Sequence, residues 1–405
     1  MKIVIWQKVL TFHVFYTWNS FEKLVNNKIL HIVTGFESDV RRNQGWKFPD
    51  LGGYDVIKLN KFNWLINGIK ILETNKDAIH IFFSFWGERK YFPLILYAAW
   101  RGIKVAVLNE PYSTSFTGYL KEDPFIISWA KAKLRPIIYR FFALSLKLIS
   151  RDKPPCILAI SLLARDQFIR AGFDEKTIFL FGHFVKKVSL KKDLKEMDQG
   201  NLRLVFVGGL LKRKGLDLLI ESVETLSSSG IKVTLDIYGA GQPDKFVPQD
   251  SVCVHYQGIL PQDDVQGAIT QYDYLVLPSR HDGWGVVVNE ALLQGVPVVV
   301  SDRVGAKCIV ETSGAGFVFK SEDCNDLTDT LKKLVLTPNI IDDLRKQAAQ
   351  VGKLILPEVA ASYLYDVFNY YFQGSKGHRP DAIWCGGETA KRISNKDSLV
   401  DHQLG

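Results

Sequence analysis

Residues 274–301 read YLVLPSRHDGWGVVVNEALLQGVPVVVS and predict a strand, a loop, a helix and a second strand. The apolar run 274–277 ends at a proline, which is typical of a buried parallel strand that leads into a loop. An acidic, glycine-containing loop follows at 282–285, and a short helix then ends at Gly295. The apolar run 296–300 is the next predicted strand. This order indicates an α/β protein with a parallel sheet.

Two carboxylates in this stretch, Asp282 and Glu290, are expected at the carboxyl edge of the sheet, where open α/β folds bind ligands. Asp282 falls on the loop and Glu290 in the first or second helical turn, so both can line one cleft. The loop glycines let the backbone approach a ligand, and the following N–H groups form an anion site. Because carboxylates do not bind phosphate, we expect these two to accept hydrogen bonds from sugar hydroxyls.

The loop 208–215, GGLLKRKG, supplies positive charge at a second strand-to-helix turn. Gly208 and Gly209 free the backbone, and Lys212, Arg213 and Lys214 precede a helix N-terminus. Such a turn can neutralise a diphosphate. A basic surface loop ahead of a helix is the alternative.

The stretch 274–301 resembles the E-x7-E signature of retaining glycosyltransferases of the glycosyltransferase-B (GT-B) fold, the family-four group. The family pattern is P-S-x-x-E-G-F-G-x-x-x-x-E-A-x-x-x-G-x-P-V-V, and here Asp282 replaces its first Glu and Trp284 its Phe. Lys214 matches the Lys of a second family pattern, G-R-L-x-x-x-K-G, and Gly209 stands where the family often has Arg. The other matching residues are Gly215, Pro278, Ser279, Gly283, Gly285, Glu290, Ala291, Gly295, Pro297, Val298 and Val299.

The resemblance implies a nucleoside diphosphate sugar, UDP- or GDP-linked, as the donor substrate. Lys214, with Arg213 or Lys212 as a second charge, would neutralise its diphosphate in place of a metal, and no cofactor is expected. Glu290 would bind the ribose hydroxyls and Asp282 a hydroxyl of the donor sugar. Other residues would contact the donor through the backbone or as cavity wall. These are Gly208, Gly209, Tyr238, Gly258, Ile259, Leu260, Gly283, Trp284 and Gly285, with core packing as the alternative for Trp284.

The first half of the chain also alternates strands with helices, which indicates another parallel sheet. No G-x-G-x-x-G follows its first strand, so dinucleotide binding has little support. Glu110, after the predicted strand 103–108, is a candidate to orient or deprotonate the acceptor hydroxyl. A salt-bridged loop glutamate is the alternative. His13, in the loop after the first strand, is a weaker substrate-binding candidate.

These patterns predict two Rossmann-like doubly wound domains, residues 1–184 and 201–356, which face each other across a cleft. A lysine-rich linker, 185–200, is expected between them. By resemblance, the apolar helix 357–373 returns to the first domain. Residues 374–405 are polar and are expected to form a tail.

Residues 124–150 interleave lysine and arginine with aromatic and aliphatic residues, a composition typical of a helix at a membrane interface. An amphipathic helix packed on its own sheet is the alternative. Pro136 predicts a kink or two separate helices. No apolar run is long enough to predict a membrane-spanning helix.

The net charge of +8 favours anionic partners such as nucleotide phosphates or an anionic membrane surface; no nucleic acid partner is expected. The five cysteines are scattered and contain no C-x-x-C pair, which argues against a disulfide framework and a zinc site and for a reducing cytosol. We therefore expect a cytoplasmic protein, with a peripheral position on the cytoplasmic membrane face as a further option.

The sequence thus predicts a retaining, metal-independent transferase that moves a hexose-type sugar to a saccharide or lipid-linked saccharide, the leaving diphosphate taking the acceptor proton. Two alternatives stay open. One is an epimerase or phosphorylase of the same fold, and the other is a non-catalytic module that binds sugars or polyanions.

Overall fold

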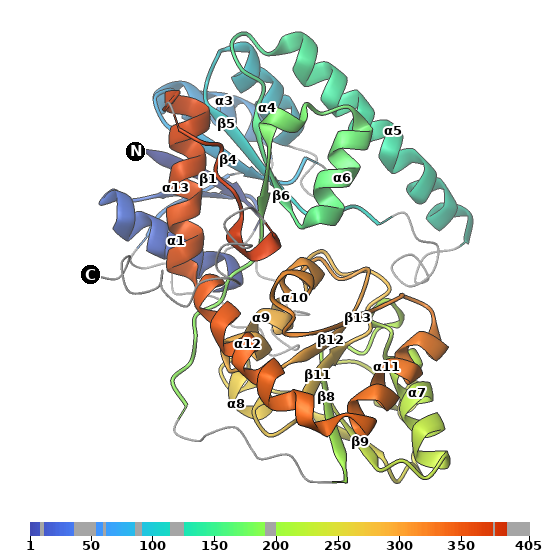
Figure 1. Ribbon diagram of the computed structural model, residues 1–405. Coiled ribbons are helices and arrows are strands. Elements are labelled where there is room, and N and C mark those ends of the chain that lie inside the picture. The colour runs from blue at the N-terminus through green and yellow to red at the C-terminus, as the bar shows by residue number, and fades with distance from the viewer. Residues whose placement is uncertain are drawn as a thin grey trace.

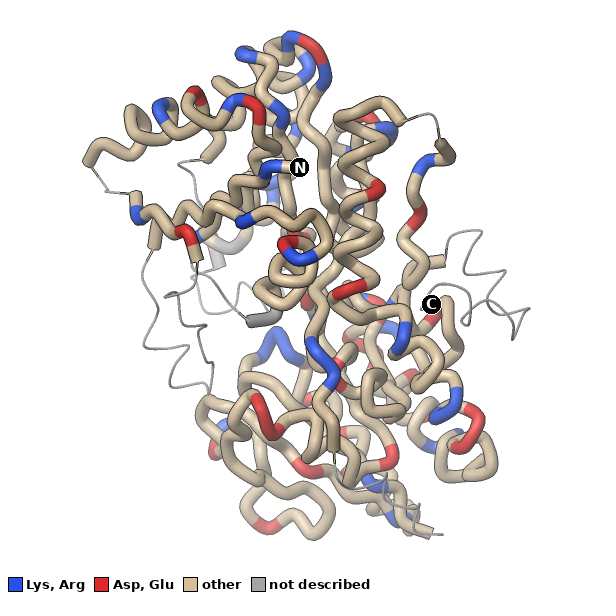
Figure 2. Tube along the Cα trace, turned by 90° about the vertical axis from the view of Figure 1, so that its left-hand side faces the viewer, with Lys and Arg blue, Asp and Glu red and all other residues tan. Residues whose placement is uncertain are grey.

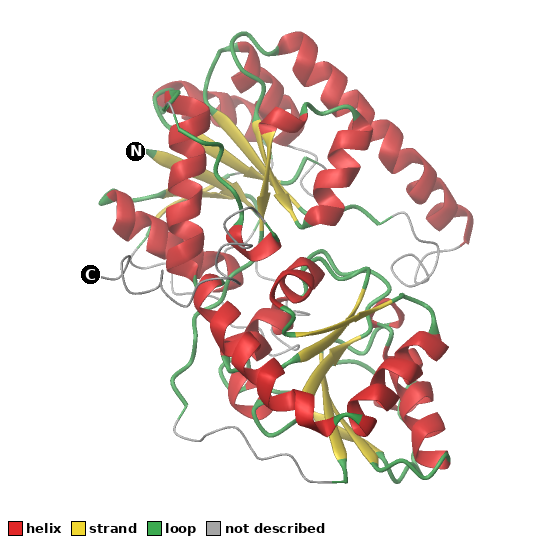
Figure 3. Ribbon diagram, in the orientation of Figure 1, coloured by secondary structure: helices red, strands yellow, loops and turns green. Residues whose placement is uncertain are grey.

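The computed structural model describes residues 1–8, 12–35, 54–59, 62–85, 91–113, 125–190, 200–375 and 377–386. The chain forms two lobes, each with a parallel sheet between layers of helices (Figure 1; Figure 3). The predicted α/β class with two doubly wound parallel sheets is confirmed. In the side view of Figure 2, basic and acidic residues are interspersed over both lobes.

The first sheet has seven strands in the order β3-β2-β1-β4-β5-β6-β7. The chain order reverses between β1 and β4, which places a topological switch point at the middle of the sheet. Its central strands are buried along their whole length because helices cover both faces. The strands are β1 (Ile3–Gln7), β2 (Leu30–Val33), β3 (Asp55–Lys58), β4 (Ile79–Phe83), β5 (Val105–Asn109), β6 (Cys156–Ile160) and β7 (Ile178–Phe181). The helices are α1 (Phe12–Val25), α3 (Trp64–Thr74), α4 (Tyr91–Trp100), α5 (Phe125–Ile149) and α6 (Leu162–Ala171).

The second sheet has six strands in the order β10-β9-β8-β11-β12-β13, with its switch point between β8 and β11. The strands are β8 (Leu202–Val207), β9 (Val233–Tyr238), β10 (Val254–Gly258), β11 (Tyr274–Leu277), β12 (Val298–Ser301) and β13 (Gly316–Phe319). The helices are α7 (Leu216–Ser228), α8 (Val265–Ile269), α9 (Val286–Leu293), α10 (Lys307–Ser313), α11 (Cys324–Leu336) and α12 (Ile341–Leu354).

The last helix, α13 (Pro357–Gln373), leaves the second lobe and lies against α1 of the first (Figure 1). The rings of Phe21 and Phe368 meet there with centroids 6.0 Å apart. Tyr371 donates a hydrogen bond from its hydroxyl to the carbonyl oxygen of Pro154, at 2.8 Å. This helix therefore ties the two lobes together through apolar packing.

Two features of the C-terminal region differ from the sequence-based expectation. Trp384 is fully buried between Phe184 and Tyr363, so residues 377–386 pack on the protein instead of forming a loose tail. Cys385 forms a disulfide with Cys308 of α10, so the expectation that no disulfide forms was wrong for this pair. The two cysteines are separated by 77 residues, and only the folded chain brings them together.

The basic, aromatic segment forms the single helix α5, which continues through Pro136 instead of breaking into two helices. Helices α4 and α6 pack against it on one side. Within the described residues, no helix is long and apolar enough to cross a membrane.

Candidate active site

A cavity of about 830 Å³ lies between the two lobes, where the carboxyl ends of both sheets face each other. Phe83 and Asn109 line it from the ends of β4 and β5, and Val207 and Tyr238 line it from the ends of β8 and β9. Strand ends of both sheets therefore open onto the same space. This is where parallel α/β folds place ligand sites, because helix N-termini and strand-end side chains converge there.

The basic loop reaches the cavity because Gly215 permits a tight turn. Gly215 has φ 70°, and a β-carbon there would lie 1.9 Å from the carbonyl oxygen of Pro278. The loop thus packs directly on the end of β11. Lys214, Arg213, Gly208 and Gly209 line the cavity as the sequence predicts.

Arg280 stabilises the basic loop, a role that the sequence analysis did not predict. Its guanidinium group binds the Asp217 carboxylate through two hydrogen bonds, of 2.6 and 3.0 Å, and donates to the Lys212 carbonyl oxygen at 2.7 Å. Lys212 pairs with the same aspartate and does not line the cavity. Between Lys212 and Arg213, the alternatives for the second cavity charge, only Arg213 is in position. The sequence signal that could have indicated this role is the position of Arg280, two residues before Asp282.

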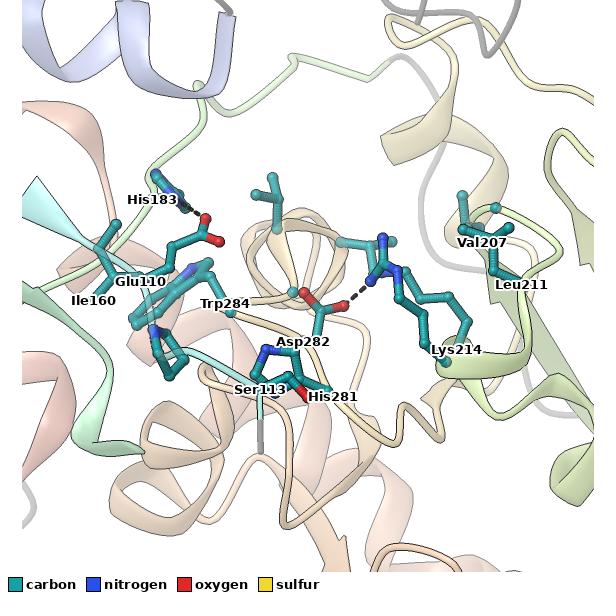
Figure 4. Close-up of a pocket in the computed structure, with 18 of the residues that line it drawn as sticks. Glu110, Ser113, Ile160, His183, Val207, Leu211, Lys214, His281, Asp282 and Trp284 are labelled. Carbon is teal, nitrogen blue, oxygen red and sulfur yellow. Dashed lines mark hydrogen bonds and ion pairs between the residues drawn. The ribbon is translucent and has the colours of Figure 1, made fainter. Parts of the chain in front are cut away.

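Asp282 is buried at the bottom of the cavity, where its Oδ2 atom lies 2.5 Å from Nζ of Lys214 (Figure 4). Burial opposes ionisation of this carboxyl group, yet the Lys214 charge and hydrogen bond lower its pKa below the usual range. Asp282 is therefore an ionised acceptor, and Lys214 is a charged donor at the same point. A ligand that binds here would therefore contact a negative and a positive group at the same place.

Glu290 lies in α9, whose first residue follows Gly285, and its side chain is buried against the cavity wall. Burial raises the pKa of this carboxyl group to about 8. Among the described residues, no donor forms a hydrogen bond with it. A buried acceptor without a protein partner is suited to ligand hydroxyl groups, which would replace the water lost on burial.

Glu110 approaches the cavity from the first lobe and forms a 3.0 Å hydrogen bond between its Oε1 and Nε2 of His183. Partial desolvation in the interlobe cavity opposes ionisation, although 56% of the side chain is exposed, and the His183 hydrogen bond and charge lower the pKa of Glu110. Glu110 and His183 lie on one side of the cavity, Lys214 on the other, and Asp282 between them (Figure 4). The sequence analysis assigned His183 no role, although this residue follows β7 much as Glu110 follows β5.

Trp284 lies in the cavity wall and is also packed in the core. Its ring lines the cavity, and it also packs so tightly on the chain that a β-carbon at Gly182 would lie 2.5 Å from it. The ring nitrogen donates to Asn289 at 2.8 Å. The neighbouring loop residues Gly283 and Gly285 line the same wall.

The remaining predicted positions divide into two groups. Ile259 and Leu260 line the cavity next to Tyr238, whereas Gly258 ends β10 without lining it. His13 lies in α1, and its side chain falls outside the described part of the structure. Within the described ranges, no three His, Cys, Asp or Glu side chains are grouped so that they could hold a metal ion.

Comparison with known proteins finds a family that matches the second lobe. Residues 201–336 match the family described as glycosyl transferases group 1. Over these residues the second lobe is therefore similar to group 1 glycosyltransferases. The match covers Arg213, Lys214, Asp282 and Glu290, which line the cavity from the second lobe.

Curated relatives of this chain include two glycosyltransferases named for polysaccharide biosynthesis. An uncharacterized 41.2 kDa protein in the cps region of Klebsiella pneumoniae is 27% identical over 273 residues, which are 65% of this chain and 71% of that protein. The capsular polysaccharide biosynthesis glycosyltransferase CapM of Staphylococcus aureus is 22% identical over 59% of this chain and 65% of its own length. The amylovoran biosynthesis glycosyltransferase AmsK of Erwinia amylovora is 26% identical over 44% of this chain and 47% of its own.

Solved structures show the same two-lobed GT-B fold. HepE of Anabaena, solved in complex with UDP and glucose, has a TM-score of 0.63 at 13% identity and covers 91% of this chain and 100% of that one. The lipopolysaccharide outer core galactosyltransferase WaaB has a TM-score of 0.62 at 15% identity, over 92% of this chain and 100% of that one. At these identities the likeness shows the fold.

Proposed function

We propose that this glycosyltransferase moves a hexose-type sugar from a nucleoside diphosphate donor to a saccharide or lipid-linked saccharide, with retention of the anomeric configuration. The observation that carries the proposal is the meeting of Lys214, Asp282 and Glu290 in one interlobe cavity. One of these groups suits a diphosphate and two suit hydroxyl groups. The relatives' roles in polysaccharide biosynthesis support a carbohydrate acceptor.

The donor fits this cavity in one direction. Its diphosphate would lie at the basic loop, against Lys214 and Arg213, with the backbone of Gly208 and Gly209 close by. The ribose would take its place at Glu290. The donor sugar would then lie near Asp282, which would exchange its Lys214 contact for a sugar hydroxyl. UDP is the nucleotide that we favour, because the HepE complex contains it.

The proposed reaction is a front-side displacement. The acceptor hydroxyl oxygen forms a bond to the anomeric carbon on the face from which the diphosphate leaves. The bond between that carbon and the diphosphate oxygen breaks, its electron pair stays on the diphosphate, and the hydroxyl proton moves to a diphosphate oxygen. Lys214 and Arg213 stabilise the negative charge that grows on the leaving group. Glu110, oriented by His183, would position the acceptor hydroxyl.

We also propose that the reaction needs no metal ion, since the protein directs two cations at the expected diphosphate position. Turnover should then persist in excess EDTA. Activity that EDTA abolishes and magnesium or manganese restores would refute this part of the proposal.

The direct test is to incubate the protein with a panel of nucleotide sugars and saccharide acceptors and to identify products by mass and NMR. Lys214→Met should lower turnover about 100- to 1000-fold, as loss of one transition-state charge contact does. The matched control is Lys320→Met, at an exposed lysine of the second lobe. A variant Lys214→Met that keeps wild-type turnover would defeat the proposal. An epimerase would consume donor without acceptor, and a phosphorylase would require inorganic phosphate.

A further inference from the structure

Helix α5 has two faces of different character, and only one of them packs on the protein. Buried residues of one face fill the core of the first lobe; for example, the rings of Phe142 and Phe92 are in contact, with centroids 4.0 Å apart. The helix lies along the outer side of the lobe (Figure 1). Its opposite face carries large apolar side chains that are exposed to solvent. These exposed residues are Ile126, Ile127, Trp129, Leu134, Ile137, Phe141, Leu144 and Leu148.

The exposed apolar residues form a continuous stripe. From Leu134 to Leu148 they recur after three and four residues in turn, which places them on one side of the helix. The exposed fraction is 58% for Phe141 and 74% for Leu148. From residue 127 to 148 the stripe extends about 32 Å at roughly 1.5 Å per residue. An exposed apolar surface of this length marks an interaction site, because soluble surfaces rarely keep one without a partner.

Basic residues lie along one edge of the stripe at a regular spacing. Lys133, Arg140 and Lys147 recur every seventh residue, and all three are exposed. Lys131 lies on the other edge. The sequence of α5 contains no acidic residue. An apolar stripe with cationic edges and no carboxylate is the arrangement of a helix in a membrane interface, with alkyl side chains toward the lipid tails and cations at the headgroups.

The same charges argue against a second copy of α5 as the occupant. In a helix pair, residues that flank the apolar seam meet flanking residues of the partner. A second α5 would bring only lysine, arginine or uncharged residues to this edge. An anionic bilayer satisfies both the apolar stripe and its basic edge.

Helix α5 also forms part of the cavity. Arg135 and Tyr139 line it on the acceptor side, and Arg135 donates to the carbonyl oxygen of Ser113 at 2.9 Å. We propose that the α5 stripe docks on an anionic bilayer and thereby brings the cavity next to a lipid-linked acceptor held in that bilayer. The acceptor part rests on the proposed glycosyl transfer, whereas the docking part stands without it.

The test is co-sedimentation of the full chain with vesicles of phosphatidylcholine alone and of phosphatidylcholine with phosphatidylglycerol. We expect binding to the anionic vesicles that weakens with added salt. Combining Lys133→Gln, Arg140→Gln and Lys147→Gln should lower binding about 100-fold, at roughly fivefold for each cation. Combining Phe141→Ser, Leu144→Ser and Leu148→Ser should lower it further. The matched control combines Lys320→Gln, Lys333→Gln and Lys346→Gln, at exposed lysines of the second lobe.

Thermal shift with UDP, measured for every variant, checks folding and donor binding separately. If the protein does not bind UDP but does bind anionic vesicles, the result contradicts the proposed function and leaves the docking proposal standing. Docking on a bilayer is overturned if wild type does not bind anionic vesicles, binds phosphatidylcholine equally well, or keeps its affinity in the triple glutamine variant. It is also overturned if analytical ultracentrifugation shows a dimer that the serine variant dissociates, because a second copy would then cover the stripe.

Discussion

Gly283 of the second lobe lies so close to Glu110 of the first that a β-carbon at position 283 would come within 2.5 Å of the Glu110 carboxylate oxygen. The two lobes thus touch at the cavity itself, and the contact sets how near Glu110 comes to Asp282.

Gly283→Ala should displace Glu110 and lower turnover about tenfold or more, because small misplacements of positioning groups are costly. The Glu110 side chain can yield, so the free energy of unfolding should change by only about 1 kcal/mol or less. Steady-state kinetics and thermal unfolding would measure the two effects. The control is Gly267→Ala, where an added β-carbon meets only ordinary contact at 3.6 Å. Unchanged turnover in Gly283→Ala would show that the contact has no catalytic consequence.

Donor binding should release protons from Glu290. The pKa of this group is about 8 in the free protein, so it is largely protonated near neutral pH. Ribose hydroxyls that donate to the carboxylate favour its ionised form and lower its pKa on binding. Donor affinity should therefore rise with pH and level off above about pH 8. Calorimetry in buffers of different ionisation enthalpy would count the released protons, and Glu290→Gln should release fewer. Equal proton release by both proteins would contradict the prediction.

The same raised pKa predicts a pH-dependent stability. An acid whose folded pKa lies above its unfolded value favours the folded state when protonated, and this contribution declines as pH rises between the two values, from about 4 to about 8. Glu290→Gln cannot ionise. The melting temperature of Glu290→Gln, relative to that of wild type, should therefore increase as pH rises through this window. A constant difference between pH 4 and 9 would mean that Glu290 is not the group responsible.

His183 is expected to act by positioning Glu110. His183→Ala should lower kcat about 10- to 100-fold while donor affinity stays near that of wild type. Without the histidine, the pKa of Glu110 should rise, which moves the acidic limb of the pH profile to higher pH. A purely structural role would lower activity without moving that limb. The control is His255→Ala, at an exposed histidine of β10.

Arg280 should control nucleotide affinity through the basic loop. Arg280→Lys keeps the charge but loses the paired hydrogen bonds to Asp217 and the contact to Lys212. We expect UDP affinity to fall about tenfold and the free energy of unfolding to fall by about 1 to 3 kcal/mol. Calorimetry and thermal unfolding would measure these changes beside Arg151→Lys, an exposed arginine of the first lobe. Affinity equal to wild type would show that the loop holds its shape without Arg280.

The sequence by itself determined the two sheets and the second-lobe part of the site. Apolar runs, glycine positions and charges within 208–215 and 274–301 are local signals, because strand-to-helix turns are encoded within a few residues. Local pattern together with the family resemblance was therefore enough to assign Lys214, Asp282 and Glu290 to one cavity.

Only the tertiary structure decided the partners that cross between lobes and elements. The Glu110–His183 bond joins residues that are 73 positions apart, and Arg280 meets Asp217 across 63. The disulfide of Cys308 with Cys385 is a third such case. Packing geometry sets these distances, and a local pattern carries no information about them. For α5, composition showed that it was basic and apolar, but only its packing on the first lobe decided which residues face the core and which face outward.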